Sequence, residues 1–188
     1  MVSYIQPKKY EEYVYVLDFI PNGKSITVKG RTGPLIQSIG EDMLILLEIL
    51  AMNNVKFTVG ERVSIGKDSR VKIISVLGRL TYNDLTPMAK NELLNVITKI
   101  ILNNEYKFVD YFNKLQPITP RLHALELIPG IGKTTLREIL KNRETKPFES
   151  FDDIQKRIKL KEPWKLLAER ILEEIKGNAK INILVKRI

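Results

Sequence analysis

The first eighty residues carry short β-branched and aromatic runs that are separated by turn-forming residues. This pattern predicts strands at 13–20, 25–28, 42–52, 60–66 and 71–76. Residues 21–23 (Pro-Asn-Gly) are a turn signal between the first two strands. Residues 42–52 are almost continuously apolar, and the turn signals on both sides favour a buried strand over a helix. Several short strands within about 70 residues predict a small, OB-like β-barrel.

From residue 81 onward the apolar positions recur every three or four residues, which is the period of a helix. The first helix is expected to begin with Thr86 as N-cap and Pro87 at its first position. The further expected elements are helices that begin at Tyr106, at Thr119-Pro120 and after the cap Ser150, a helix at 164–175 and a terminal strand at 182–185. The fold class predicted for the chain is therefore α+β, with an N-terminal barrel followed by an all-helical region.

A glycine-rich turn lies between two of the helical patterns, at residues 127–135 (Leu-Ile-Pro-Gly-Ile-Gly-Lys-Thr-Thr). Glycine allows a positive φ and leaves no Cβ in the way of a ligand. The amides of Gly130, Ile131 and Gly132, together with the start of the next helix, are expected to offer unpaired N–H donors and a positive dipole end to an anion. Lys133 adds a mobile positive charge beside them. The alternative is an ordinary corner between two helices, in which the glycines serve only the turn.

These residues resemble the nucleic-acid-binding helix-hairpin-helix motif in its Pro-Gly-Ile-Gly form, here over residues 119–142. The resemblance implies that the hairpin amides bind a backbone phosphate without reading bases. Thr134 belongs to the same site, and Arg137 and Lys141 are expected to line the next phosphate. An ATP-binding P-loop is disfavoured, because Leu127 stands where that motif needs glycine and no strand precedes it.

A weaker copy of the hairpin follows at an offset of 32 residues, with its turn at 161–164. This turn has no glycine and cannot offer a bare backbone to a ligand. We therefore interpret the first hairpin as the binding half and the second as a packing half.

The charge of the chain is strongly positive and unevenly distributed. Of 188 residues, 31 are basic and 22 acidic, which gives a net charge of +9. Residues 116–188 hold 16 basic and 10 acidic residues, against 15 and 12 in the longer segment before them. An acidic partner such as nucleic acid is expected. Lys67, Arg70 and Lys72 form a second basic group in the predicted barrel, and an ordinary solvated surface is an equal alternative for them.

Several kinds of chemistry find no support in the residues. The chain has no cysteine, so disulfides, zinc-finger sites and thiol catalysis are excluded. His123 is the only histidine, and its expected role is a hydrogen bond that locks the hairpin. Asp152 and Asp153 suit the first turn of a helix better than a metal site. We expect no cofactor, no metal, no catalysis and no membrane segment, and a cytoplasmic location.

The chain also resembles an archaeal family as a whole, the domain-of-unknown-function family six-five-five, whose members are thought to bind nucleic acid. The carrying segments are Gly60-Glu61-Arg62-Val63, Ile65-Gly66, Leu85-Thr86, Ala89-Lys90, Glu92-Leu93, Phe108-Val109, Phe112-Asn113, Ile118-Thr119, Arg121, His123, 125–133, Pro147-Phe148, Ser150-Phe151 and Asp153-Ile154. The resemblance covers most of residues 13–176 and implies a barrel-like domain joined to a helix-hairpin-helix region. Thr134 stands where the family carries a further Lys, which removes one charge from the phosphate site.

Three domains follow from these patterns: a barrel at 1–80, a connecting helical pair at 81–117 and a helix-hairpin-helix domain at 118–188. The predicted function is non-catalytic nucleic-acid binding that leans to structured RNA, in a ribosomal or RNA-processing assembly. The alternatives are binding of duplex or branched DNA, and a protein-interaction module within a larger nucleic-acid assembly.

Overall fold

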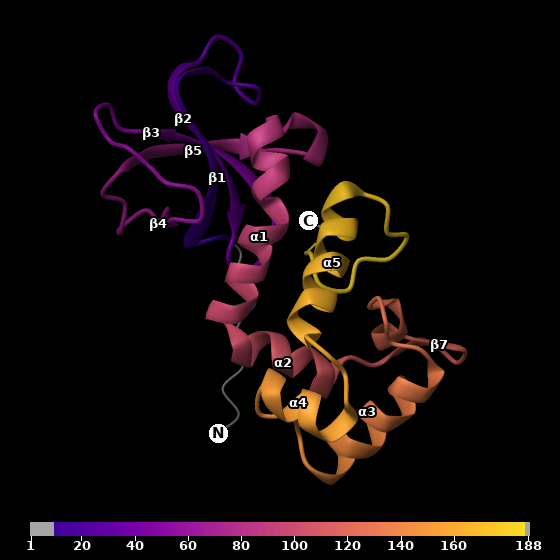
Figure 1. Ribbon diagram of the computed structural model, residues 1–188. Helices are drawn as coiled ribbons and strands as arrows, with labels where there is room; N and C mark the ends of the chain where they lie inside the picture. Colours follow the sequence, from indigo (N-terminus) through magenta and orange to yellow (C-terminus); the bar gives the residue numbers. More distant parts are fainter. Residues whose placement is uncertain (1–9, 187–188) are drawn as a thin grey trace. The chain divides into compact units, whose positions relative to one another are not determined.

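The computed structural model describes residues 10–186, and its fold is mixed α+β (Figure 1). The described chain divides into two compact units, one of residues 10–96 with 185–186 and one of residues 97–184. The boundary falls inside helix α1 (Pro87–Asn103). The finer three-part division drawn from the sequence stays a prediction.

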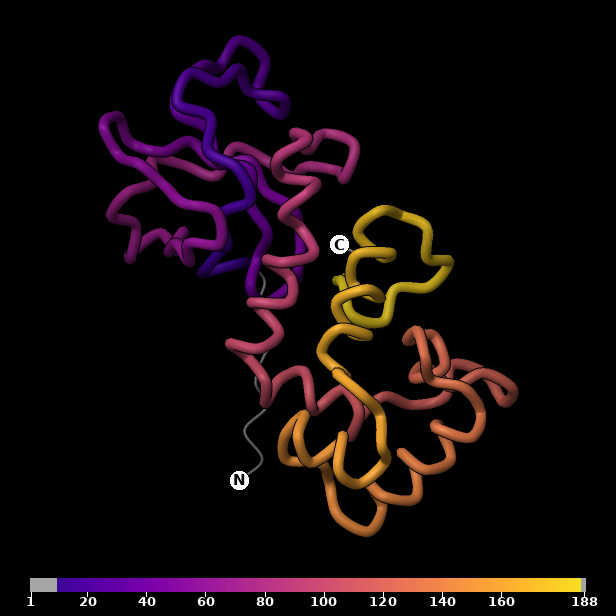
Figure 2. The backbone as a smooth tube through the Cα atoms, viewed as in Figure 1, coloured from indigo at the N-terminus to yellow at the C-terminus, as the bar shows by residue number. Residues whose placement is uncertain are grey.

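The first unit is built on a curled, five-stranded antiparallel sheet that forms a half-barrel (Figure 2). Its strands are β1 (Tyr13–Lys24), β2 (Thr32–Gly40), β3 (Leu46–Ala51), β4 (Arg62–Ser64) and β5 (Ile73–Arg79). Their order across the sheet is β4-β1-β2-β3-β5. The β-branched and aliphatic side chains that predicted strands fill the core of this unit, with Val16, Ile36 and Ile49 fully buried.

The predicted hairpin at residues 13–28 is wrong in its second half. β1 continues through residues 21–23 instead of turning there, and a register shift between Ile20 and Gly23 absorbs the irregularity. Residues 25–31 form a loop, and the partner strand is β2, which the sequence pattern did not reveal. The physical reason is Glu48 on β3, whose buried carboxylate accepts hydrogen bonds from the start of this loop.

A second group of polar side chains ties β4 to the rest of the half-barrel. Arg62 donates two hydrogen bonds to Glu41, at 2.8 and 2.7 Å, and its guanidinium lies 3.5 Å from the centre of the Tyr13 ring. Tyr15 donates its hydroxyl to the same Glu41 carboxylate. Hydrogen bonding to Glu41 raises the pKa of Arg62, so this cation stays charged throughout the useful pH range.

The cap-and-proline start predicted for the first helix is confirmed. Thr86 Oγ1 accepts the amide of Ala89 at 3.1 Å, and α1 begins at Pro87 after the short η1 (Tyr82–Asp84). Helix α2 (Glu105–Lys114) follows and buries Phe108, Val109 and Phe112. Phe108 and Phe112 belong to the core of the second unit, whereas Tyr106 on the same helix is 82% exposed.

The helix predicted to begin at Thr119-Pro120 is wrong. The chain instead forms a small antiparallel hairpin, β6 (Pro117–Thr119) with β7 (Leu122–His123), followed by the short helix η2 (Ala124–Leu127). The amide of Ala124 donates to the carbonyl of Gln116, which closes the hairpin. Pro120 therefore occupies a turn, a position that its fixed φ also suits.

Three further helices complete the second unit: α3 (Lys133–Thr145), α4 (Phe151–Ile158) and α5 (Pro163–Lys176). Ser150 caps α4 by accepting the amide of Asp153 at 3.0 Å, as predicted. Residues 182–185 are not a strand, because the carboxylate of Glu174 on α5 accepts the amides of Ile183 and Leu184. Arg143 on α3 donates to backbone carbonyls at the end of α2. Arg157 on α4 donates to backbone carbonyls at the end of α3.

The half-barrel core predicts a contrast between two isoleucines. Ile49 on β3 is 0% exposed and Ile74 on β5 is 47% exposed. Ile49→Ala is expected to lower the free energy of unfolding by about 2–5 kcal/mol, because it leaves a cavity. The control Ile74→Ala should cost less than about 1 kcal/mol. Urea unfolding measures both, and similar losses in the two variants would contradict this core assignment.

Candidate nucleic-acid interface

The glycine-rich turn connects η2 to α3 and is anchored by two buried side chains. Ile128 and Ile131 are 1% and 5% exposed, whereas Gly130 and Gly132 lie at the surface. Gly130 has φ +81°, a left-handed conformation in which any side chain is strained. Gly132 has φ −89° and an extended backbone, and a Cβ there would meet nothing within 4 Å. The turn therefore needs glycine at 130, while the open space at 132 leaves room for a ligand.

One of the predicted donors of this turn is not free. The amide of Ile131 donates to the carbonyl of Ile128 at 3.2 Å and is not available to a ligand. The first backbone bond of α3 runs from the Leu136 amide to the Gly132 carbonyl. Among the described residues, no acceptor satisfies the amides of residues 132–135, and no side chain caps the helix. An anion would therefore meet the N-terminus of α3, where the helix dipole also favours negative charge.

Glu126 links the two sides of the turn, a role that the sequence interpretation missed. Its carboxylate accepts the amide of His123 at 2.9 Å and pairs with Lys133 Nζ at 2.7 Å. The hydrogen bond from Lys133, together with that from the His123 amide, lowers the pKa of Glu126. A Glu three residues after a helix-capping position is the signal that could have identified it.

His123 makes a local hydrogen bond at the start of η2, and a lock on the whole hairpin stays a prediction. Its Nδ1 accepts the amide of Leu125 at 3.1 Å, and the side chain is 7% exposed. Nδ1 can accept only when it carries no proton, so the ring is neutral and Nε2 holds the hydrogen. Burial lowers the pKa of His123, and the nearby Arg143 charge lowers it further against the opposing effect of Glu126.

The basic side chains of α3 are divided between structural and free roles. Lys133 is ion-paired with Glu126 and also approaches the carbonyl of Arg121 at 3.5 Å, although it remains largely exposed. Arg137 and Lys141 are exposed and make no ion pair among the described residues. The spacing of four residues places Lys133, Arg137 and Lys141 along one side of the helix, and Thr134 is exposed in its first turn. The structure thus brings these residues together beside the free amides.

The three basic residues predicted on the barrel are less available. Arg70 donates to the carbonyl of Ile65 at 2.7 Å and so holds its own loop. Lys72 pairs with Glu61 at 2.8 Å, which lowers the pKa of that carboxyl despite the opposing effect of burial. Lys67 is exposed beside Asp68 in the sequence. Of the three, only Lys67 has no structural contact among the described residues.

The acidic side chains of the described chain do not gather into a metal site. No group of three or more His, Asp or Glu side chains within residues 10–186 could hold a metal ion. Asp152 and Asp153 lie in the first turn of α4 and pair with Lys156 and Arg157. No helix in the same part of the chain combines the length and the apolar character that crossing a membrane requires.

Comparison with known proteins finds relatives that cover nearly the whole chain. A family model described as "Protein of unknown function (DUF655)" matches residues 10–186. The uncharacterized protein MJ0038 of Methanocaldococcus jannaschii is 42% identical over 175 residues, which are 93% of this chain and 79% of the relative. The crystal structure of Af1531 from Archaeoglobus fulgidus has a TM-score of 0.82 and 42% identity, and it covers 94% of this chain and 100% of its own.

The buried, neutral state of His123 predicts the behaviour of its proton NMR signal. Because this is the only histidine, its ring protons can be followed without assignment of neighbours. The pKa is expected below 6.5, the ordinary value, and should return to that value in urea. As pH falls, the unfolded chain therefore takes up the His123 proton before the folded chain does. The free energy of unfolding is expected to be highest above about pH 6.5 and to decrease between that pH and the pKa of the folded protein.

His123→Asn is the matched control for this titration. Asn can accept the Leu125 amide through its side-chain oxygen and does not titrate. The variant should therefore keep the fold and lose the pH dependence of unfolding in that window. A pKa of 6.5 or higher in the folded protein would contradict the hydrogen bond from Leu125 to Nδ1.

Proposed function

The chain belongs to the DUF655 family, as its sequence resemblance predicted, and we propose that it is a non-catalytic protein that binds nucleic acid through backbone phosphate. The single observation that carries the proposal is the uncapped N-terminus of α3. Four successive amides, at residues 132–135, have no acceptor among the described residues. The first of these residues is Gly132, which has no side chain that could cover them. A phosphate oxygen is the acceptor that such a group of donors suits best.

The packing around the turn supports a helix-hairpin-helix interpretation. η2, the glycine turn and α3 form one helical pair, although its first helix is only one short turn. α4 and α5 form the second pair, whose turn carries left-handed conformations at Lys159 and Glu162. A Cβ at Gly130 would lie 3.5 Å from Leu166 on α5, so the two pairs are in contact at the turn. The second pair supports the first and offers no bare backbone of its own.

The charge around α3 supports an anionic partner. Arg137 and Lys141 extend the positive surface from the N-terminus of α3 along the helix, and both are exposed. Lys133 is paired with Glu126, but the pair is at the surface and a phosphate could compete for the Lys133 ammonium group. Contacts of this kind position a nucleic acid and carry no sequence information.

The half-barrel favours RNA over duplex DNA. Its strand order, β4-β1-β2-β3-β5, suits a five-stranded OB-like barrel that is partly open. Folds of that kind bind single-stranded or structured nucleic acids, and no helix in the described chain carries the pattern of a major-groove reader. We infer structured RNA as the partner, in a ribosomal or RNA-processing assembly within the cytoplasm, with duplex or branched DNA as the alternative.

A protein-interaction module is the second candidate function. The observation in its favour is that Ile131 uses its amide inside the turn and Lys133 is already paired. If the hydrogen-bond donors of the hairpin are used within its own turn, the hairpin is a packing element. A partner protein would then bind over its surface. The two candidates differ in whether blocking the N-terminus of α3 abolishes nucleic-acid binding.

Gly132→Asp tests the proposed phosphate site and should leave the fold intact. Asp is a preferred N-cap residue, and its carboxylate can accept the amides of Thr134 and Thr135 that a phosphate would use. Affinity for a structured RNA is expected to fall about ten- to a hundredfold, while the free energy of unfolding stays equal or rises. Fluorescence anisotropy and urea unfolding measure the two quantities.

Asn53→Asp on the exposed turn after β3 is the control, since it changes the charge by the same amount. It should reduce affinity only slightly. Full RNA affinity in a folded Gly132→Asp protein would refute the phosphate site and favour the interaction module.

Competition between nucleic acids tests the choice of partner. A structured RNA and a duplex DNA of equal length compete for the labelled complex at physiological salt, and the RNA is expected to bind more tightly. Affinity for the RNA should also fall steeply as salt rises, because phosphate contacts release counterions. Tighter binding of the DNA would reverse the assignment, and a flat salt response would argue against phosphate contacts altogether.

A further inference from the structure

The loop between β1 and β2, residues 25–31, is held in place by one buried carboxylate. Glu48 on β3 is 2% exposed and accepts the Ser25 hydroxyl at 2.6 Å, the Ile26 amide at 3.0 Å and the Thr27 amide at 3.1 Å. The Thr27 hydroxyl donates to the same carboxylate. A buried charge is costly unless it is fully hydrogen-bonded, so this loop and Glu48 stabilise one another.

Further bonds fix the course of the loop. The Val28 amide donates to the Ser25 hydroxyl, and the Arg31 amide donates to the Val28 carbonyl. The loop also rests on β5, because a Cβ at Gly78 would lie 2.9 Å from the Thr27 Cβ. A loop with this many internal and sheet contacts is preorganised, which lowers the entropy cost of binding a partner.

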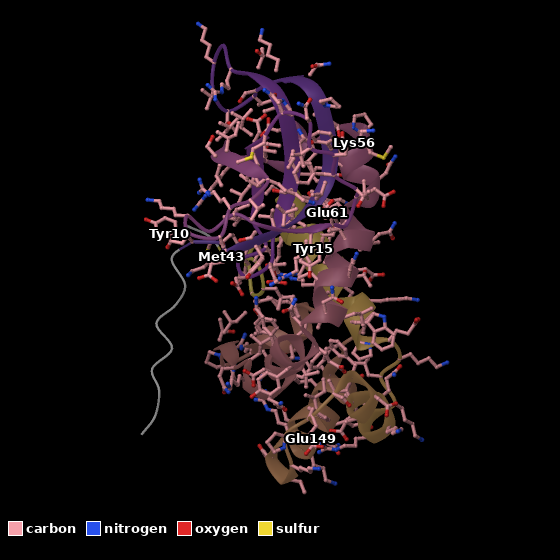
Figure 3. All side chains as sticks on the ribbon, turned by 90° about the vertical axis from the view of Figure 1, so that its left-hand side faces the viewer. Tyr10, Tyr15, Met43, Lys56, Glu61 and Glu149 are labelled. Atoms are coloured by element: carbon pink, nitrogen blue, oxygen red, sulfur yellow. The ribbon has the colours of Figure 1, made fainter. Side chains whose placement is uncertain are left out.

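The outer side of this loop combines positive charge with exposed aliphatic groups. Lys24, Lys29 and Arg31 are exposed, and the sequence has no Asp or Glu between Asp18 and Glu41. Ile26 and Val28 are also exposed, at 55% and 37%. Figure 3 shows nitrogen-tipped side chains that project from this indigo end of the ribbon. Among residues 10–186, Glu48 is the only acidic group to which the loop is bonded, and it accepts bonds from the loop backbone and hydroxyls.

We propose that the β1–β2 loop is a second RNA-binding surface, in which Lys24, Lys29 and Arg31 bind backbone phosphates and Ile26 and Val28 cover unpaired bases. The nucleic-acid partner is that of the proposed function, but the contact is made by residues of the other unit. Charge complementarity favours a polyanion, because three cations have no acidic neighbour within their own segment. The exposed aliphatic pair favours RNA with unstacked bases over a smooth duplex.

The contrast with the basic residues 67–72 explains why this loop is the better candidate. Arg70 and Lys72 are engaged in contacts that shape their own segment. Lys24, Lys29 and Arg31 make no ion pair among the described residues, and the Arg31 backbone rather than its side chain closes the loop. In the described part of the chain, the β1–β2 loop thus carries three exposed cations that make no ion pair.

The test is a comparison of two double variants in the full-length chain. Lys29→Ser with Arg31→Ser removes two loop cations, and Lys56→Ser with Lys180→Ser removes two exposed cations elsewhere (Lys56 is labelled in Figure 3). Anisotropy with a fluorescein-labelled stem-loop RNA, titrated from about 50 to about 300 mM salt, gives the slope of log K against log salt. The loop variant is expected to bind more weakly with a slope smaller by about 1.4, since each single-strand phosphate contact contributes about 0.7. The control pair should retain the wild-type slope.

The backbone amides of the loop provide a second readout in the unaltered protein. NMR signals of Ile26, Thr27, Val28 and Gly30 are expected to shift when the stem-loop RNA is added. An unchanged slope in the loop variant together with unshifted loop signals would overturn the proposal. Displacement of the RNA by polyglutamate of equal total charge would also overturn it, because the loop would then suit an acidic protein.

The proposals for the β1–β2 loop and for the N-terminus of α3 can be refuted separately. If the loop variant binds normally while Gly132→Asp does not, the loop proposal is wrong and the proposed function stands. If the loop variant loses affinity while Gly132→Asp binds normally, the loop is the RNA contact and the phosphate site on α3 is wrong.

Discussion

Buried carboxylates that require hydrogen-bond donors control the loops of this protein. Glu48, Glu11 and Glu174 are each at least 94% buried, and each accepts backbone amides of a neighbouring segment. A carboxylate left without donors in such a place would cost several kcal/mol, so each loop is held to one course. These segments are therefore held in place by carboxylates that lie beneath them. Glu126 does the same at the surface, where it connects both sides of the glycine turn.

Hydrogen bonding also separates the cations that hold the fold together from those that stay exposed without an ion pair. Arg62, Arg143 and Arg157 donate to carboxylate or carbonyl oxygens and hold strands and helices together. Arginine suits this role because its planar group binds several acceptors at once. Among the described residues, the exposed cations that make no ion pair include Arg137 and Lys141 on α3 and Lys24, Lys29 and Arg31 on the β1–β2 loop. A net charge of +9 alone could not distinguish these groups.

The backbone geometry of the glycine turn determines which of its amides are free to bind a ligand. Gly130 is required by its positive φ, and Ile131 uses its amide to close the turn. Donors that remain are the amide of Gly132 and those of the first turn of α3, which the motif had suggested together with the turn. His123, buried and neutral, holds η2 beneath them. A phosphate would thus bind the helix end rather than the turn itself.

The sequence by itself determined the mixed α+β class and the caps at Thr86 and Ser150, because these depend on neighbours within a few residues. It also placed the glycine turn before α3. Only the tertiary structure decided that residues 25–31 form a loop and that residues 117–123 form a small hairpin. Glu48 imposes the first conformation from another strand, and a contact across the fold leaves no periodic pattern in the sequence. The small hairpin is closed by the bond from the Ala124 amide to the Gln116 carbonyl, and its strands are too short to show an alternating pattern. Which cations stay free was decided in the same way, since each one depends on the acceptor that folding brings to it.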